Sequence, residues 1–205
     1  MNHKVLNVGQ LHADAKELFE TSVVGAEDSS ADMILANLQE AIQILKSTWE
    51  GRDAGVQIEN IVKVYNGMVA LRNELGLLAQ TTTKIAADYR EIQNVNGGGA
   101  EDLIVVKTDE KTFIEDYVDT RDTVNITEEA FNGKEKLEDA QTGLEGFQVD
   151  ANTSLSKIMD NWLSGSNRDK AKELFDNFQG NVTKYKEVLT DVVDSLTTAL
   201  GNYNR

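Results

Sequence analysis

The chain has 205 residues, none of them proline or cysteine, and its 35 acidic and 20 basic side chains give a net charge of −15. Proline is the commonest helix breaker and averages about 5% of residues, so its absence favours long helices over an all-β sandwich. The lack of cysteine excludes disulfides, thiolate metal sites and thiol nucleophiles. The acidic surface opposes contact with nucleic acid or anionic lipid.

No targeting signal is visible at the start of the chain. Met1–Gln10 has no apolar run of signal-peptide length, and nowhere do about 18 apolar residues follow one another, so we expect neither a classical signal nor a membrane span. A short amphipathic helix is predicted over Leu11–Val24. His3 and His12 are the only histidines. They lack metal-ligand spacing, and we expect both to be exposed to solvent.

Two apolar stripes follow, with a turn between them. Both advance in steps of three and four residues, which places their members on one face of a helix. They predict one helix that ends at Trp49 and a second, of about 40 residues, after the turn. The members are Ile34, Leu38, Ile42, Leu45 and Trp49, then Ile61, Val64, Met68, Leu71, Leu75, Leu78, Thr82, Ile85 and Tyr89.

A break and an acidic connector, residues 100–124, come next. Three consecutive glycines within Asn94–Gly99 make continued helix costly, at roughly 1 kcal/mol each. In the connector, Leu103–Val106 fits either a short strand or the start of a helix. If residues 109–123 were helical, the three carboxylates Glu115, Asp119 and Asp122 would share one face, which we expect to be solvated because the EF-hand pattern is missing.

The second half repeats the stripe arithmetic. Members before the second turn lie 113 residues beyond their counterparts (34 to 147, 49 to 162), and members after it lie 114 beyond (61 to 175, 89 to 203). One extra residue in the turn accounts for the difference, so the pattern indicates an internal duplication. The members are Phe147, Ala151, Leu155, Ile158 and Trp162, then Phe175, Phe178, Val182, Tyr185, Leu189, Val192, Leu196, Ala199 and Tyr203.

These elements predict an all-α fold: an elongated, four-helix-bundle-like pair of antiparallel hairpins with an extra N-terminal helix and an irregular connector. A single hairpin has only one seam, and a second hairpin covers its other flank. The expected division is a first hairpin at 1–99, the connector at 100–124 and a second hairpin at 125–205.

The turns carry specific chemistry. Gly51 and Gly165 stand where a helix that ends beside a Trp needs a positive φ at its C′ position. Asp53, and Ser166 with Asp169 three residues on, have the spacing of N-terminal caps for the helices that follow. Trp49 and Trp162 are expected to plug the ends of the seams. For Gly67 and Gly180, inside the long helices, close helix approach and simple tolerance both fit.

Trp49-Glu50-Gly51, between two apolar stripes in an acidic chain without proline or cysteine, resembles the Trp-x-Gly turn of the WXG family of type VII secretion proteins. The resemblance covers roughly 31–93 and 144–205. It implies helical hairpins that usually pair as dimers, whereas here two hairpins are fused and the second turn, Trp162–Gly165, has an extra residue. The family's export signal, a Tyr followed four residues later by Asp or Glu, is not matched.

The export-signal position falls at the two stripe ends. Tyr89 is followed at that distance by Gln93, and Tyr203 lies two residues before the last residue given. We therefore expect a non-enzymatic protein without a cofactor, made in the bacterial cytoplasm and secreted without a classical signal, or an escort of an exported partner. Its partners would be the secretion machinery or a secreted helical effector, and a homodimer is a further option. The alternative is a cytosolic helical adaptor or chaperone unrelated to secretion.

Overall fold

A computed structural model describes residues 4–5, 7–92, 103–108 and 111–203. Its long elements are helices, so the predicted all-α fold is confirmed. The break predicted at 94–99 lies outside the described residues. The helices are α1 (Val8–Glu17), the π-helix η1 (Leu18–Val23), α2 (Ala31–Thr48), α3 (Arg52–Ile92), α4 (Ala130–Asn161) and α5 (Ser166–Tyr203). The short strands are β1 (Lys4–Val5), β2 (Trp49–Glu50), β3 (Asn125–Ile126) and β4 (Trp162–Ser164).

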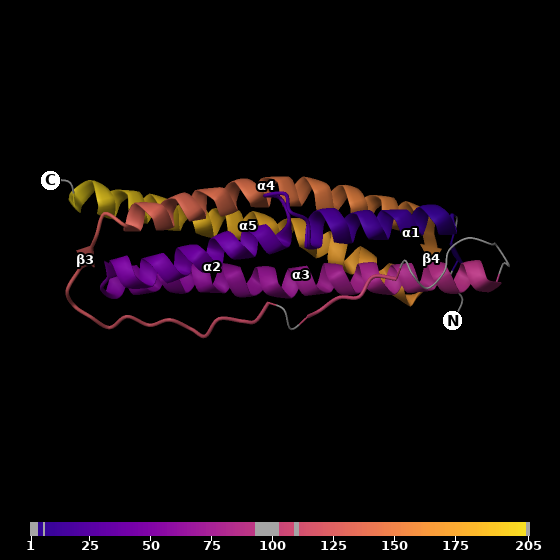
Figure 1. Cartoon of the computed structure of the whole chain (residues 1–205), viewed down its shortest axis with the longest axis horizontal. Coiled ribbons are helices and arrows are strands. Elements are labelled where there is room, and N and C mark those ends of the chain that lie inside the picture. The colour runs from indigo at the N-terminus through magenta and orange to yellow at the C-terminus, as the bar shows by residue number, and fades with distance from the viewer. Residues whose placement is uncertain (1–3, 6, 93–102, 109–110, 204–205) are drawn as a thin grey trace.

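The long helices form two hairpins that lie side by side in one elongated bundle (Figure 1). α2 and α3 reverse at Trp49, and α4 and α5 reverse at Trp162. The hairpins run antiparallel, so the two Trp turns lie at opposite ends of the rod, one beside β3 and one at β4 (Figure 1). α2 packs mainly on α4, and α3 packs on α5. α3 has 41 residues and spans roughly 60 Å.

The predicted stripes form the core of this bundle. All members of the two stripes that end at Trp49 and Trp162 are buried, with at most 4% of any of them exposed. The described stripe members on α3 and α5 are buried or half-buried. Phe147 of α4 and Phe178 of α5 meet between the arms of the second hairpin, with ring centroids 5.3 Å apart. Each such buried side chain stabilises the fold by about 1.5–3 kcal/mol.

The first arm of the first hairpin is broken, whereas α4 is continuous over 32 residues. The helix predicted over Leu11–Val24 is present as α1 followed by the π-helical η1. Helix α2 then begins after Ser30, whose hydroxyl accepts from the Met33 N–H at 3.3 Å and donates to the Gly25 carbonyl at 2.6 Å. Because α1 packs on both α3 and α4, the broken arm also covers the far part of α3.

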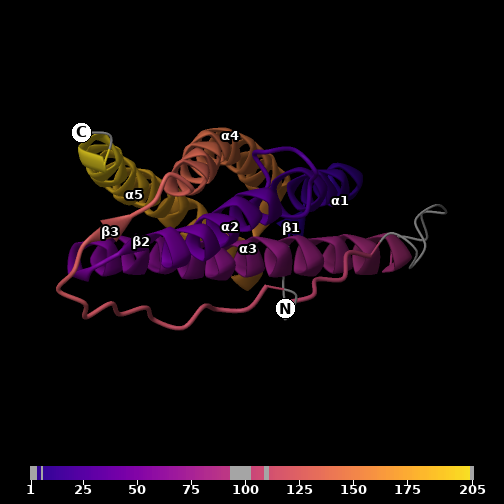
Figure 2. The same ribbon diagram turned by 60° about the vertical axis from the view of Figure 1, so that its left-hand side comes forward.

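The described part of the connector is an extended segment that lies along α3 (Figures 1 and 2). Residues 103–108 and 111–124 contain neither helix nor strand, so the irregular connector that the sequence predicted is confirmed. The shared helix face of Glu115, Asp119 and Asp122 does not form, and Leu103–Val106 is extended chain rather than a strand or a helix start. The topology explains this, because α4 begins beside the Trp49 turn while α3 ends at the opposite end of the rod. Extended chain covers about 3.3 Å per residue against 1.5 Å in a helix, so relatively few residues make the return. We call residues 103–108 and 111–124 the strap.

Each Trp turn pairs with a strand that leads into the other repeat. β2 at Trp49 pairs antiparallel with β3, which leads into α4, and β4 at Trp162 pairs antiparallel with β1, which leads into α1. β4 has three residues where β2 has two, in agreement with the extra residue in the second turn. The two short pairs tie the repeats together at both ends of the bundle.

The two glycines inside the long helices differ in their surroundings. A Cβ on Gly67 would overlap the Tyr185 hydroxyl of α5, so the glycine permits the close approach of α3 and α5. Nothing lies within 4 Å of the corresponding point on Gly180. The first glycine therefore serves packing, and the second is tolerated on an exposed helix face.

Candidate functional site: the Trp turns and the strap

The first turn is a buried indole followed by a left-handed glycine. Trp49 is 4% exposed, and Gly51 has φ 117°. The positive φ was predicted, but Gly51 is not the C′ residue of α2. It follows the extended pair β2 and directly precedes α3, where its carbonyl accepts from the Gly55 N–H at 2.9 Å. A Cβ on Gly51 would lie 2.9 Å from the Thr123 carbonyl oxygen, so the strap also requires glycine here.

The second turn has the same geometry. Trp162 is fully buried, Gly165 has φ 129°, and the Gly165 carbonyl accepts from the Asp169 N–H at 3.1 Å. The predicted capping box of Ser166 with Asp169 is therefore wrong, because helix α5 already includes Ser166. Arg168 closes the turn by donating from Nε to the Trp162 carbonyl at 2.7 Å.

The N-terminus of α3 is capped by the strap rather than by Asp53. Asp119 accepts from the Gly51 N–H at 3.0 Å, and the Arg52 N–H donates to the Arg121 carbonyl at 3.1 Å. The Arg121 guanidinium binds Asp119 and also Glu50 in the turn itself. Hydrogen bonds from Arg121 and then from the Gly51 N–H hold the pKa of Asp119 well below its ordinary value of 3.8. Hydrogen bonds to Asp119 and then to Glu50 raise the pKa of Arg121.

A ladder of polar side chains on α3 binds the main chain of the strap. Both amide atoms of Asn66 bond Ile114, accepting from its N–H at 2.8 Å and donating to its carbonyl at 2.9 Å. The other contacts join Glu59 to Tyr117, Asn73 to Thr108 and Gln80 to Val106. The four α3 positions, 59, 66, 73 and 80, recur every seven residues and therefore share one face of the helix. Sequence reasoning missed this ladder, although the seven-residue spacing of one carboxylate and three amides is visible in the chain.

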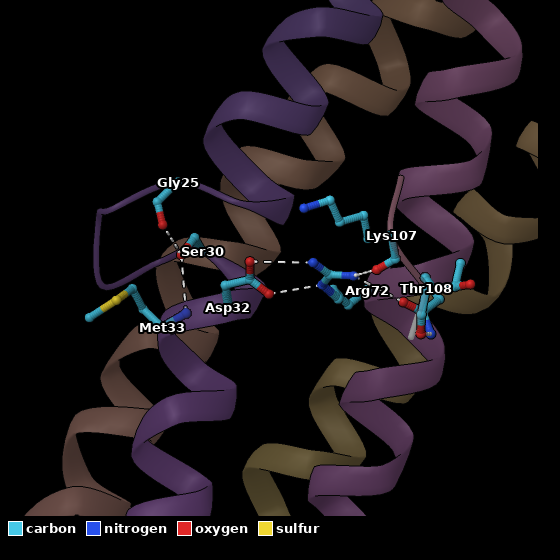
Figure 3. A network of polar contacts seen from close by, with 8 residues as sticks. Gly25, Ser30, Asp32, Met33, Arg72, Lys107 and Thr108 are labelled. Atoms are coloured by element: carbon cyan, nitrogen blue, oxygen red, sulfur yellow. Dashed lines mark hydrogen bonds and ion pairs between the residues drawn. The ribbon is translucent and has the colours of Figure 1, made fainter. Parts of the chain in front are cut away.

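Arg72 is the centre of a polar network that joins α2, α3 and the strap (Figure 3). Only 1% of its side chain is exposed, and its Nε lies 2.8 Å from Oδ1 of Asp32 on α2. Its Nη1 also donates to the Lys107 carbonyl of the strap at 2.9 Å. A buried guanidinium is stable only when it is paired and hydrogen-bonded, so Arg72 depends on both partners.

The second repeat contains an equivalent ion pair, which the strap does not cover. Adding the offsets of 113 and 114 maps Asp32 onto Glu145 and Arg72 onto Lys186. Lys186 Nζ lies 3.0 Å from Glu145 Oε1, with the two side chains 31% and 67% exposed. Two charges of the right sign at equivalent positions support the internal duplication independently of the apolar stripes.

The remaining predicted residues lie apart from these contacts. Tyr89 is half-buried near the end of α3, and Gln93, four residues on, lies outside the described residues. Tyr203 is the last residue of α5, and its side chain also lies outside the description. The expectation that His12 is exposed is wrong: it is 7% exposed, because α1 packs between α3 and α4.

The described part of the chain also carries two open grooves of similar size. One, of about 690 Å³, lies between α3 and α5 and includes Leu77, Leu174 and Lys170. The other, of about 680 Å³, lies beside the Trp49 turn, between β3 and the end of α5. Within the ranges that the structure covers, no three His, Cys, Asp or Glu side chains are placed to hold a metal.

The Trp turns and the strap are held by hydrogen bonds, ion pairs and apolar contacts between elements. None of the helices, over the part of the chain described, combines the length and apolar content needed to cross a bilayer. Comparisons with protein-family models, curated proteins and solved structures gave no match.

Proposed function

We propose that the protein is a non-enzymatic, WXG-like component of a bacterial type VII secretion pathway, exported itself or escorting an exported partner. The supporting observation is the antiparallel packing of two Trp-turn hairpins within one chain. The family resemblance implies hairpins that pair as dimers, and here one chain supplies both members of the pair. The face that a single hairpin would offer to its mate is thus already used, and a partner binds an outer surface.

The second turn is the better candidate for that outer surface. Both indoles are buried, so each fixes its turn from inside. Around the first turn, the strap takes up the Gly51 N–H and the Glu50 carboxylate. At the second turn, Leu163 beside the indole is 53% exposed. A secretion component or exported helix would therefore contact Leu163 rather than either Trp.

An escort role suits the chain better than self-directed export. The Tyr-x-x-x-Asp/Glu signal of the family is not matched at Tyr89, which is followed at the required distance by Gln93. An escort would travel with, or release, a partner that carries its own signal. Both versions need recognition by protein contacts alone, which suits a chain with a net charge of −15 and long amphipathic helices.

The test is deletion of the secretion ATPase in the source organism, with the protein followed in culture supernatant and in pull-downs. Export predicts that deletion removes the protein from the supernatant. An escort that releases its partner predicts that the protein stays in the cells of both strains and co-purifies with a pathway component or exported protein. Unchanged supernatant levels together with no pathway component in the pull-down would defeat the proposal.

A matched pair of variants tests the docking surface. Leu163→Ser changes the exposed apolar residue of the second turn, and Val149→Ser makes a similar change on α4, where Val149 is 65% exposed. We expect Leu163→Ser to reduce co-purification of the pathway component and Val149→Ser to leave it unchanged. Equal effects of the two variants would remove the second turn from the proposal.

A cytosolic adaptor unrelated to secretion is the second candidate. The observation in its favour is the deep burial of Trp49 and Trp162, because an indole that only plugs a bundle needs no secretion partner. The same deletion experiment separates the two candidates, since an adaptor keeps its location and its bound proteins when the ATPase is absent.

A further inference from the structure

The open groove between α3 and α5 begins near the second Trp turn. Its volume is about 690 Å³, and on α5 it extends from Asn167, two residues after Gly165, to Asn181. Beyond its other end the two helices meet where the Tyr185 side chain packs on Gly67. α5 lies at an angle to α3 (Figure 2), so the helices separate away from this contact. The groove is the space that opens between them on the side of the second turn.

Leucine side chains line this groove without being fully buried. Leu77 of α3 is 47% exposed, and Leu174 of α5 is half-buried. The bundle does not require leucine here, because the offset of 114 between the repeats relates these two positions to Asp191 and Asn60. Exposed apolar side chains that gather in a groove are typical of a surface that binds another protein.

The two ends of the groove differ in charge. Lys170 of α5 lies close to Asn167, near the second turn, and Glu74 of α3 lies nearer the Tyr185 contact. Because α3 and α5 run antiparallel and Gly67 lies opposite Tyr185, Glu74 and Lys170 are about eight residues of helix apart, or roughly 12 Å. Over the described ranges neither side chain forms an ion pair, and both are exposed.

The walls of the groove suit an added helix and not an extended segment. α3 and α5 are continuous helices over this stretch, so their main-chain groups are bonded internally and offer no ladder to an added strand. A helix satisfies its own main chain and binds a groove through the side chains of its apolar face. Apolar side chains on that face would fill the space between Leu77 and Leu174.

The charges at the two ends set the direction of such a helix. An acidic residue would lie opposite Lys170, and a basic residue would lie opposite Glu74. Acidic side chains stabilise the first turn of a helix and basic side chains the last turn. The added helix would therefore begin near the second Trp turn and end near Tyr185. A second copy of this chain is disfavoured as the occupant, because each copy has a net charge of −15.

We propose that the α3–α5 groove is a docking site for an amphipathic helix of a partner protein, with an acidic first turn and a basic last turn. The apolar face of that helix contacts Leu77 and Leu174. Its acidic turn pairs with Lys170, and its basic turn pairs with Glu74. This inference does not rest on the secretion role, because it can be tested with the purified chain alone.

The test is a nuclear magnetic resonance titration of the isotope-labelled full chain with a synthetic peptide of about 14 residues, held helical by a side-chain staple. The peptide has leucines every three or four residues on one face, a glutamate in its first turn and a lysine about eight residues later. A control peptide has the glutamate and the lysine exchanged. We expect the amide signals of Leu77 and Leu174 to shift, and the first peptide to bind about fivefold more tightly.

Matched variants separate groove contacts from bulk charge. Leu77→Gln should weaken binding about tenfold. Val56→Gln, on the same helix but beyond the Tyr185 contact, should leave the affinity unchanged, and Val56 is likewise exposed, at 55%. Glu74→Lys with Lys170→Glu keeps the net charge at −15 and should reverse the preference between the two peptides. Circular dichroism of each variant checks that the fold is retained.

Four results would overturn the docking site. The first is no shift at Leu77 or Leu174 up to about 1 mM peptide. The second is equal binding of the two peptides by the parent chain and by the charge-exchanged variant. The third is an equal effect of Leu77→Gln and Val56→Gln. The fourth is a dimer in sedimentation that Leu77→Gln converts to a monomer, because a second copy would then fill the groove. Loss of the secretion phenotype would leave these measurements unaffected.

Discussion

The two hairpins share one plan, yet the strap covers only the first. The equivalent ion pairs show the difference: the Arg72 side chain is 1% exposed under the strap, whereas its counterpart Lys186 is 31% exposed. Likewise, α3 carries Asn66 where the corresponding position of α5 is Gly180. The duplicated features hold the bundle together, and the unique polar residues of the first repeat hold the strap.

This difference has a simple topological origin. Two separate antiparallel hairpins would need no connection, but a fused chain must return from the end of α3 to the start of α4. The path runs along α3, so side chains of α3 supply hydrogen-bond partners for the extended main chain. The second repeat had no such requirement, and its equivalent surface stays open to solvent.

The largest expected effect lies in what the repeats share. Trp49→Ala and Trp162→Ala each remove a buried indole that closes a seam, so each should lower the free energy of unfolding by about 3–5 kcal/mol. Urea unfolding followed by circular dichroism measures this loss. A loss below about 1 kcal/mol at either turn would show that its indole is not a structural plug.

The next effect separates the covered ion pair from the open one. Asp32→Ala leaves the Arg72 guanidinium buried with one partner removed, and we expect a loss of about 3 kcal/mol. Glu145→Ala breaks the equivalent pair at the surface, where about 0.5 kcal/mol or less is expected. Denaturant midpoints of both variants test the ratio. Similar losses would mean that burial under the strap does not increase the contribution of the ion pair to the free energy of unfolding.

Features that depend on periodic residue patterns could be predicted from the sequence alone. The stripes ending at Trp49 and Trp162 predicted the helices, the reversals and the repeat, because burial on a helix recurs every three or four residues. The positive φ of Gly51 and Gly165 was also predicted, although each glycine follows a short strand and precedes a helix instead of ending one. These features depend on local sequence and on one hydrophobic seam.

The strap contacts were not readable in the same way. Asp119 bonds Gly51, which lies 68 residues earlier in the chain, and no local sequence pattern predicts this contact. The acidic residues of the connector did not decide between helix and extended chain, whereas the path length between α3 and α4 requires extended chain. The burial of His12 has a similar cause, because it depends on where α1 packs against α3 and α4. Long-range topology, rather than residue type, decided all three.

Acid should weaken the contact between the strap and the first turn. Because its folded-state pKa is lowered, Asp119 contributes stability that is present at neutral pH and is lost as the pH falls below about 4. Asp119→Asn should therefore be less stable than the parent protein near pH 7, and the difference should shrink below about pH 4. Urea midpoints across this range test the sign. A difference that stays constant down to about pH 2 would exclude Asp119 as its source.

The smallest effects compare one ladder position in the two repeats. Asn66→Ala removes two hydrogen bonds to Ile114, partly offset by the better helix propensity of alanine, and should cost about 1 kcal/mol. At the equivalent position, Gly180→Ala meets nothing within 4 Å and should stabilise the helix by about 0.5–1 kcal/mol. Thermal and urea unfolding of both variants give the two signs. If both substitutions stabilise the protein, Asn66 does not hold the strap, and its face of α3 is as free as that of α5.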